Sequence, residues 1–248
     1  MGDIPGIRKI KEVRALCDRS SVRRRTGLFV TEGERIYKEI PPEDLVSVYV
    51  SESYKKSHPG MKADHVLRDT EFARLADTKH PQGILAVVRQ KRYRIGDMLD
   101  GNLYIVLETL QDPGNLGTVI RTAEAAGVSA VIMNKGCADI YSPKVVRSTM
   151  GSVFRVPFIY TEDLTAVLRD MKRAGITLYA AELRGRDIND TGLSDRRAFI
   201  IGNEGNGLTE ETLRMADERV SIPMAGRVES LNAAVTAAIL MYHGMRKS

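Results

Sequence analysis

The sequence predicts an α/β protein of two domains, a small α/β domain followed by a largely parallel sheet covered by helices. Three observations predict this. Short β-branched runs alternate with helical patterns along the chain, as in strand–helix units. A charged, polar segment at 90–97 interrupts the alternation like a linker, which sets the domains at 1–96 and 97–248. Three glycine-rich stretches follow, or begin within, apolar runs of the second domain.

Composition restricts the class of protein. At 248 residues, 43% hydrophobic and 28% charged, the chain is typical of a globular protein that buries a substantial core. It has no apolar run of spanning length, and its N-terminus lacks the apolar stretch of a secretory signal, so no membrane contact is expected. Cys17 and Cys137 are isolated and lack metal-ligand spacing. We therefore expect reduced cysteines, no metal and a cytoplasmic location.

The first domain is predicted to be mixed α/β and to bind a polyanion. Periodicity predicts strands and helices in this order: helix Ile7–Cys17, strand Leu28–Thr31, helix Glu34–Ile40, strand Leu45–Val50, helix Thr70–Ala76 and strand Gly83–Arg89. Residues 1–96 contain 20 Lys and Arg against 13 Asp and Glu, whereas the remainder contains 17 against 19. This asymmetry favours nucleic-acid contact. The densest cationic cluster is Arg19, Arg23, Arg24 and Arg25, and taken on its own this charge run favours a solvated helix end.

The second domain alternates strand and helix from residue 103 onward. The expected strands are Leu103–Glu108, Ala130–Met133, Phe154–Ile159, Leu178–Ala181, Phe199–Ile201 and Arg219–Ile222. The expected helices are Asn115–Ala126, Pro143–Met150, Asp163–Ala174, Glu210–Ala216 and Ser230–Gly244. In a parallel sheet ligands bind beyond the carboxyl ends of the strands, which is where the three glycine-rich stretches would lie.

The first glycine-rich stretch, Asp112–Arg121, starts with turn residues and continues as a helix. Asn115 stands where an N-cap belongs, and Gly127 is expected to stop the helix. The predicted buried stripe is Leu116, Val119, Ile120 and Ala123. Arg121 lies away from this stripe and can face a pocket or solvent. Spacing alone somewhat favours a plain cap and a surface cation.

The second stretch, Gly202–Leu208, leaves a β-branched strand and turns before a helix. Glu204 is unusual, because it is a carboxylate between glycines at a strand terminus. The glycine order is GxxGxG, which differs from the dinucleotide fingerprint GxGxxG, and no phosphate-binding GxxxxGK[ST] loop occurs. A nicotinamide-dependent enzyme is therefore disfavoured.

The third stretch, Ile222–Gly226, precedes a helix for which Ser230 is a good N-cap by type. The side chains expected to face inward are Leu231, Ala234, Val235 and Ala238. Asn232 is a mediocre helix former in a first turn. It could satisfy buried backbone groups or hydrogen-bond a substrate.

Together the three stretches resemble the signature motifs of the SpoU/TrmH-type RNA ribose 2′-O-methyltransferases of the SPOUT class. The motifs are Asn115 with Arg121, then GNEGxGL from Gly202, then IPMxGxVxSLNxA from Ile222. The segment Tyr141–Gly151 also resembles the region between the first two motifs, and the likeness covers about residues 100–247. Residues 1–96 resemble the RNA-binding extension of rRNA-modifying members, a small domain similar to certain ribosomal proteins, with Leu28–Glu34 and His80–Ala86 as its marks.

The resemblance implies a trefoil knot in the second domain, S-adenosylmethionine (SAM) as methyl donor, and a homodimer. It assigns Arg121 to activating the ribose 2′-hydroxyl, with Asn115, Glu204, Ser230 and Asn232 ordering the site. The cofactor-binding residues that it implies are Ala181, Gly202, Asn203, Ile222, Met224 and Leu231. Arg147 joins the Arg19–Arg25 cluster as a candidate for RNA phosphate contacts.

The substrate that the resemblance favours is 23S rRNA, because tRNA-modifying members usually lack such a basic first domain. A tRNA ribose 2′-O-methyltransferase is the alternative within the same class. A non-catalytic RNA-binding protein is the alternative outside it, disfavoured by the intact Asn115, Arg121, Glu204, Ser230 and Asn232.

Overall fold

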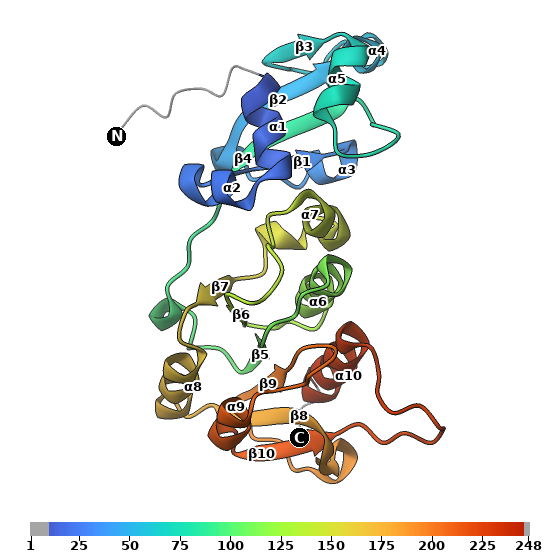
Figure 1. The fold of residues 1–248 in the computed structure, drawn as a ribbon. Helices are drawn as coiled ribbons and strands as arrows, with labels where there is room; N and C mark the ends of the chain where they lie inside the picture. The colour runs from blue at the N-terminus through green and yellow to red at the C-terminus, as the bar shows by residue number, and fades with distance from the viewer. Residues whose placement is uncertain (1–9, 246–248) are drawn as a thin grey trace. The chain divides into compact units, whose positions relative to one another are not determined.

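The computed structural model describes residues 10–245, which fold into two compact units (Figure 1). The first unit contains residues 10–91 and 139–154, and the second contains 92–138 and 155–245. The predicted start of the first helix at Ile7 and the expectation of no N-terminal signal lie outside the described residues. Within residues 10–245, no helix has the length and apolar character needed to cross a membrane.

The first unit is built on a four-stranded mixed sheet in the order β1-β4-β2-β3. Its strands are β1 (Leu28–Glu32), β2 (Leu45–Ser51), β3 (His65–Leu67) and β4 (Ile84–Arg89). β4 runs antiparallel to β1 and β2, whereas β3 runs parallel to β2. Its helices are α1 (Ile10–Asp18), α2 (Ser20–Thr26), α3 (Glu34–Tyr37), α4 (Glu52–Ser57) and α5 (Asp69–Leu75).

All six elements predicted for this region exist, but α2, α4, β3 and the 3₁₀ turn Pro42–Asp44 were not predicted. α2 (SSVRRRT) and α4 (ESYKKS) each bury a single side chain, Arg23 and Tyr54, so neither carries an apolar period. β3 has only three residues. Such short elements are stabilised by tertiary packing against neighbouring elements, and the local sequence does not reveal that packing.

Residues 139–154 lie between two strands of the second unit in sequence but pack within the first unit. They carry α7 (Pro143–Thr149), and the ring centroids of Tyr141 and Phe29 lie 4.5 Å apart. The Arg23 guanidinium donates to Asp139 Oδ2 from Nη2 at 2.7 Å and from Nε at 2.9 Å. The first unit is therefore not a continuous piece of chain.

The second unit has a six-stranded sheet, all parallel, in the order β10-β8-β9-β5-β6-β7. The strands are β5 (Leu103–Leu107), β6 (Ala130–Asn134), β7 (Phe158–Thr161), β8 (Thr177–Asp187), β9 (Arg197–Ile201) and β10 (Glu218–Ser221). The prediction of an α/β fold with a parallel sheet in this domain is confirmed. β8 extends six residues beyond its predicted end at Ala181, because polar residues continue its pairing with β10.

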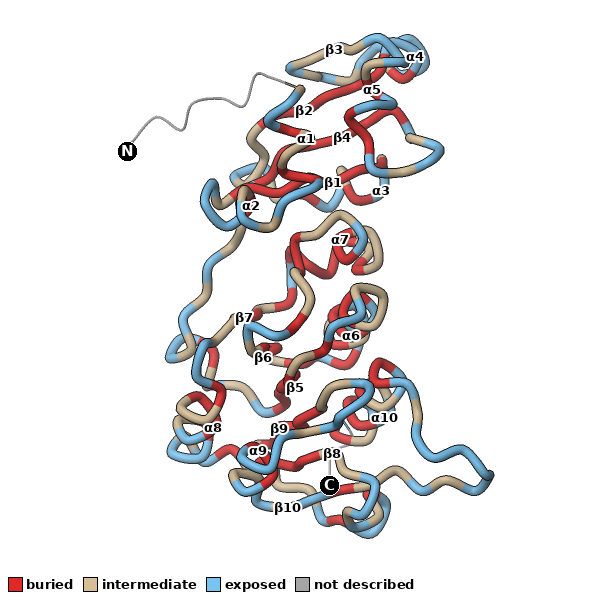
Figure 2. Tube along the Cα trace, viewed as in Figure 1, coloured by how far each residue is buried: buried red, intermediate tan, exposed pale blue. Residues whose placement is uncertain are grey.

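Helices cover both faces of this sheet (Figure 1). α8 (Leu164–Arg173) and α9 (Glu210–Met215) pack on each other and on β8, while α10 (Ala233–Met245) packs on α6 (Pro113–Ala125), β5 and β9. The central strands are consequently buried on both sides (Figure 2). α10 approaches closely because it has no side chain at Gly244: a Cβ there would lie 2.6 Å from Phe199.

Four local expectations for the second unit were wrong. The N-cap of α6 is Asp112, whose Oδ1 accepts from the Asn115 backbone N–H at 2.8 Å, so Asn115 itself is free for another role. α10 begins at Ala233 instead of Ser230, and Val235 is exposed. β7 starts at Phe158, since residues 152–154 form a 3₁₀ turn. The buried stripe predicted for α6 is confirmed.

Candidate active site

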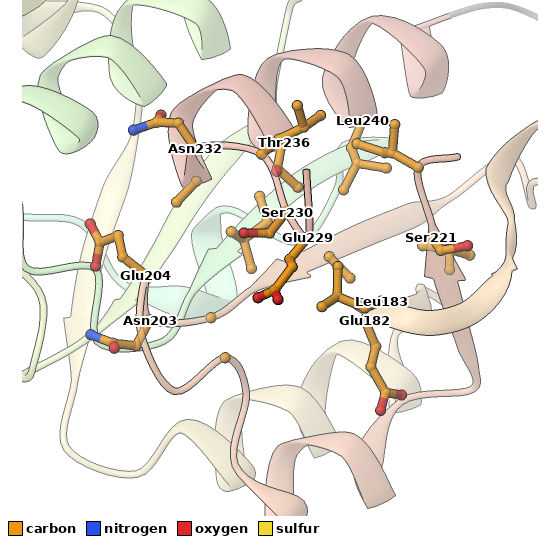
Figure 3. Close-up of a pocket in the computed structure, with 18 of the residues that line it drawn as sticks. Glu182, Leu183, Asn203, Glu204, Ser221, Glu229, Ser230, Asn232, Thr236 and Leu240 are labelled. Carbon is orange, nitrogen blue, oxygen red and sulfur yellow. The ribbon is translucent and has the colours of Figure 1, made fainter. Parts of the chain in front are cut away.

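A pocket of about 480 Å³ in the second unit lies at the carboxyl ends of β9 and β10 and beside the middle of β8. Figure 3 shows its walls: the middle of β8 at Glu182 and Leu183, the loop after β9 at Asn203 and Glu204, and α10 at Thr236 and Leu240. Every residue predicted to bind the cofactor lines it, namely Ala181, Gly202, Asn203, Ile222, Met224 and Leu231. Glu204, Ser230 and Asn232 line it as well.

The loop after β9 turns back on itself within a few residues. Asn203 and Gly207 exchange two backbone hydrogen bonds of 3.0 Å, which close the turn. A Cβ on Gly202 would lie 2.2 Å from the Gly207 carbonyl carbon and 2.5 Å from Leu208 N, so the turn requires glycine at this position. At Gly202 the pocket wall therefore carries no side chain.

Glu204 receives a ring of hydrogen-bond donors. Asn115 Nδ2 donates to its Oε1 at 3.0 Å, and the backbone N–H groups of Gln111 and Asp112 donate at 3.5 and 3.4 Å. Partial burial by itself raises the pKa of Glu204, but these hydrogen bonds outweigh it and the net pKa lies below the ordinary glutamate value. Glu204 is thus an anionic anchor at neutral pH.

Asn115 links Glu204 to the third motif. Its Oδ1 accepts from Asn232 Nδ2 at 3.0 Å while its Nδ2 donates to Glu204, so the amide orientation is fixed from both sides. Asn232 also accepts from the backbone N–H groups of Ala234 and Val235, which makes it the residue that caps α10. The three motifs therefore meet in one hydrogen-bonded chain, Asn232–Asn115–Glu204.

Two predicted catalytic residues do not take part in the Asn232–Asn115–Glu204 hydrogen bonds. Ser230 lines the pocket and is exposed. Arg121 is exposed on α6, does not line the pocket, and makes no hydrogen bond or ion pair within residues 10–245. The structure of one chain thus brings together Asn115, Glu204, Ser230 and Asn232, but not Arg121.

The predicted RNA-binding arginines divide into two groups. Arg19, Arg24 and Arg25 are exposed. Arg23 is only 4% exposed, and its guanidinium donates to the backbone carbonyls of Leu16 and Cys17 as well as to Asp139. This burial argues against a phosphate contact by Arg23, to which we assign a structural role. Arg147 is half-buried, with Nη1 2.9 Å from Asp77 Oδ2.

Sequence reasoning missed Glu108, a carboxylate only 7% exposed at the end of β5. It accepts from Thr209 N–H at 3.0 Å and from the Thr209 and Thr212 hydroxyls at 2.9 Å each. It therefore ties β5 to the first turn of α9 and so supports the loop after β9. The available signal was an acid directly after a buried strand, a position that burial makes costly unless donors surround it.

Replacing Glu108 with alanine is expected to lower the free energy of unfolding by about 2–3 kcal/mol, because the three donors lose their acceptor in a buried place. Denaturant unfolding followed by circular dichroism measures the loss. The matched control is Glu210→Ala, an exposed acid in the same helical turn, expected to cost less than about 1 kcal/mol. Equal losses in the two variants would contradict a special role for Glu108.

The pocket suits a nucleoside-bearing ligand. It combines bare backbone at Gly202, an apolar wall at Leu183, Ile222 and Leu240, and polar groups at Ser230 and Asn232. Among residues 10–245, no cluster of three or more His, Cys, Asp or Glu is arranged to hold a metal ion. Both cysteines are buried, and burial raises the pKa of Cys17 to about 12 and that of Cys137 to about 11.

Comparison with known proteins identifies the family. The model of the SpoU rRNA methylase family matches residues 102–242, more than half of the chain. The chain belongs to this family. The model of the MRM3-like substrate-binding domain matches residues 8–86. Family membership confirms the predicted enzyme class, RNA ribose 2′-O-methyltransferase, and its cofactor, SAM.

Individual relatives extend over nearly the whole chain. The chain is 32% identical over 95% of its length to the 23S rRNA (guanosine(2553)-2′-O)-methyltransferase RlmP of Bacillus subtilis, of which it covers 95%. A TrmH-family structure from Porphyromonas gingivalis matches with a TM-score of 0.85 at 29% identity, covering 98% of each chain. An AdoMet-bound rRNA methyltransferase from Sinorhizobium meliloti matches with a TM-score of 0.82 at 28% identity, covering 95% of this chain and 93% of that one.

Proposed function

We propose that this protein methylates the 2′-hydroxyl of a guanosine ribose in 23S rRNA, with SAM as the methyl donor. The observation that carries the proposal is the Asn232–Asn115–Glu204 chain, in which side chains from three distant motifs converge beside one pocket. The substrate follows the relatives: RlmP and the RlmB proteins, which cover most of this chain, act on guanosine in 23S rRNA. A ribosomal RNA substrate agrees with a cytoplasmic location.

The residues of the pocket fit SAM. Gly202 lines the pocket with main-chain atoms alone, against which a nucleoside can lie, and we assign the same role to the backbone of Ile222 and Leu231. Ala181, Asn203 and Met224 complete the wall. SAM supplies a methyl group that its sulfonium already activates. The protein must therefore position the ribose 2′-oxygen in line and help its proton to leave.

We assign Arg121 to the ribose side of the reaction. A guanidinium stays protonated in proteins, so it does not act as a base; it stabilises the negative charge that develops on the 2′-oxygen or holds an adjacent phosphate. Arg121→Lys keeps the charge but loses the planar two-pronged donor. Near-normal methyl transfer by this variant across a pH series would exclude such a clamp.

We propose that the enzyme is a homodimer whose interface includes α10. Val235, Ile239 and Tyr242 are exposed at i, i+4 and i+7 of this helix, with exposed fractions of 47%, 37% and 48%. Such a spacing puts them on one face, and an apolar stripe of this kind is typical of an interaction surface. α6, which carries the exposed Arg121, packs beside α10. A second chain on this face would lie near Arg121, which supports a site completed by both chains.

Introducing a charge into this stripe is expected to yield monomers. Ile239→Lys places an ammonium where the second chain would bury apolar surface, and light scattering coupled to gel filtration measures the mass. Methyl transfer is expected to fall with the dimer fraction. Glu210→Lys, an exposed charge change on α9, serves as the control and should leave the mass unchanged. A wild-type chain that elutes as a monomer at assay concentration would contradict the proposal.

We propose that the first unit binds RNA through Arg19, Arg24 and Arg25. They are exposed, and the region matches a substrate-binding domain. Arg24→Ala together with Arg25→Ala should weaken RNA binding and lower the slope of log K against log salt by about one unit for each phosphate that the protein no longer neutralises. Filter binding at several salt concentrations measures both quantities. An unchanged slope would mean that other residues bind the phosphates. The same measurement on Arg147→Ala tests whether Arg147 contacts a phosphate.

The trefoil knot remains part of this proposal. It is supported by the return of the chain in α10 to β5 and β9, and by the Arg197 guanidinium, which donates to the Gly244 carbonyl from Nε at 2.7 Å. Stretching a single chain from its two ends tests it. A knotted chain reaches a contour length shorter than 248 extended residues allow, whereas an unknotted one reaches the full length.

The function itself is tested by transfer of tritium from labelled SAM to separated RNA fractions that lack the modification. The proposal is supported if tritium appears in 23S rRNA and if one linkage on the 3′ side of a guanosine becomes resistant to alkali, because a methylated 2′-oxygen cannot attack the phosphate. Label confined to tRNA would support the alternative substrate, and label in a base would contradict the chemistry. Absence of SAM binding in calorimetry would instead favour a non-catalytic RNA-binding protein.

A further inference from the structure

Thr109 has a backbone conformation that threonine rarely adopts, and it lies two residues after the end of β5, in the loop that leads to α6. Its φ is +58°, in the left-handed region where a β-branched side chain is strained. Met150 is the other described non-glycine residue with a positive φ, and it ends α7 in the first unit. Strain of this kind persists only where surrounding groups enforce it, and it gathers at functional sites.

Asn134, the last residue of β6, grips Thr109 at two points. Thr109 N–H donates to Asn134 Oδ1 at 2.8 Å, and Asn134 Nδ2 donates to Thr109 Oγ1 at 3.0 Å. On the other side, Asn203 Nδ2 donates to the Thr109 carbonyl at 2.9 Å. Backbone and side chain of Thr109 are therefore bound by two asparagine amides from neighbouring strand ends.

The conformation of Thr109 decides where the next residues point. Two and three positions further on, the backbone N–H groups of Gln111 and Asp112 donate to Glu204, the anchor for Asn115. Leu110 is held as well, since its carbonyl accepts from Ala138 N–H at 2.8 Å. A change of φ at Thr109 would rotate this whole segment away from the carboxylate.

We propose that Asn134 is a positioning residue of the methyltransferase site. Its two hydrogen bonds hold Thr109 in the left-handed conformation, which directs the backbone N–H groups of Gln111 and Asp112 toward Glu204. Asn134 lies outside the pocket lining and in none of the three motifs, so it acts through Thr109 and not on a ligand. The inference rests on the proposed role of the Asn232–Asn115–Glu204 chain. The proposal has one distinguishing consequence. Asn134 should be needed for activity when residue 109 is threonine, and should no longer be needed when residue 109 is glycine.

Four proteins test this: Asn134→Ala, Thr109→Gly, the double variant, and Asn189→Ala as the control. Glycine adopts a positive φ without strain, so it needs no clamp. Asn189 is an exposed amide of the same unit whose side chain donates to Asp187 Oδ1 at 3.0 Å. The kcat of methyl transfer and the KM for RNA are measured at a temperature where circular dichroism shows every variant folded.

For Asn134→Ala we expect kcat to fall about tenfold or more, as for a misplaced catalytic geometry, with the KM for RNA within about twofold of wild type. Thr109→Gly in the same chain is expected to restore most of the lost kcat, which simple loss of stability or of a surface amide would not explain. Asn189→Ala should match wild type. If Asn134→Ala does not fold, the double variant carries the test, because relief of strain should let it fold and turn over.

Two results would overturn the inference: a folded Asn134→Ala enzyme with kcat within twofold of wild type, or a double variant as impaired as Asn134→Ala alone. Both require an active wild-type enzyme. A wild-type protein that binds no SAM and transfers no methyl group would defeat the proposed function instead, so the two failures are distinguishable.

Discussion

Gly202→Ala is expected to weaken SAM binding by about fivefold to 100-fold and to lower methyl transfer at ordinary SAM concentrations. The new Cβ would lie 2.2 Å from the Gly207 carbonyl carbon and 2.4 Å from its oxygen. These are backbone atoms of a turn closed by two hydrogen bonds between Asn203 and Gly207, so they cannot swing aside as a flexible side chain would. Overpacking of this kind costs about 1–3 kcal/mol, or roughly one to two powers of ten in affinity.

Calorimetric titration with SAM measures the effect, and the same loop supplies the control. Gly205→Ala adds an identical methyl group three residues later, where the nearest atom is Asn203 Oδ1 at 3.5 Å, an ordinary contact. This variant should bind SAM within about twofold of wild type. If Gly202→Ala bound SAM as tightly as Gly205→Ala, the pocket beyond β9 would not be the cofactor site.

Asn115→Asp is expected to lower kcat by about 100-fold or more at pH 7. The substitution replaces the donor Nδ2, 3.0 Å from Glu204 Oε1, by a carboxylate oxygen. Two like charges at this distance repel, which breaks the link from residue 115 to Glu204, although the oxygen that accepts from Asn232 Nδ2 remains. Thr118→Ala, a loss of an exposed hydroxyl one turn along the same helix, is the control and should retain activity.

The pH dependence of this variant has a definite sign. In the wild type the pKa of Glu204 lies below the ordinary glutamate value, so the carboxylate and its contribution are present at neutral pH and are lost only as pH falls through that lowered pKa. In Asn115→Asp the neighbouring charge raises the pKa of the pair, so kcat should increase as pH falls toward it. Adding Glu204→Gln removes the repulsion and should restore part of the activity at pH 7. A flat profile with no restoration would contradict the charge argument.

Local sequence determined the long elements because their signal is local. The apolar runs of β5 and β9 and the stripe of α6 are periodic patterns within single segments, and the structure buries them as predicted. α2 and β3 carry no such pattern and were missed. The cap of α6 was misplaced by three residues since both Asp112 and Asn115 are cap residues by type, and only the hydrogen bond of Asp112 distinguishes them.

The sequence alone determined the α/β class and the parallel sheet through its alternating strand and helix patterns, and it predicted one shared site because parallel strands carry the loops that follow them to one edge. The family and the motif residues came from the resemblance of the three glycine-rich stretches to known motifs. Tertiary structure decided the rest. It exposed Arg121. It also made contacts between residues that lie 25 to 116 positions apart in sequence: Arg23 with Asp139, Glu108 with Thr212, and Asn134 with Thr109. Such contacts depend on where the chain returns in space, and no periodicity within a segment encodes that.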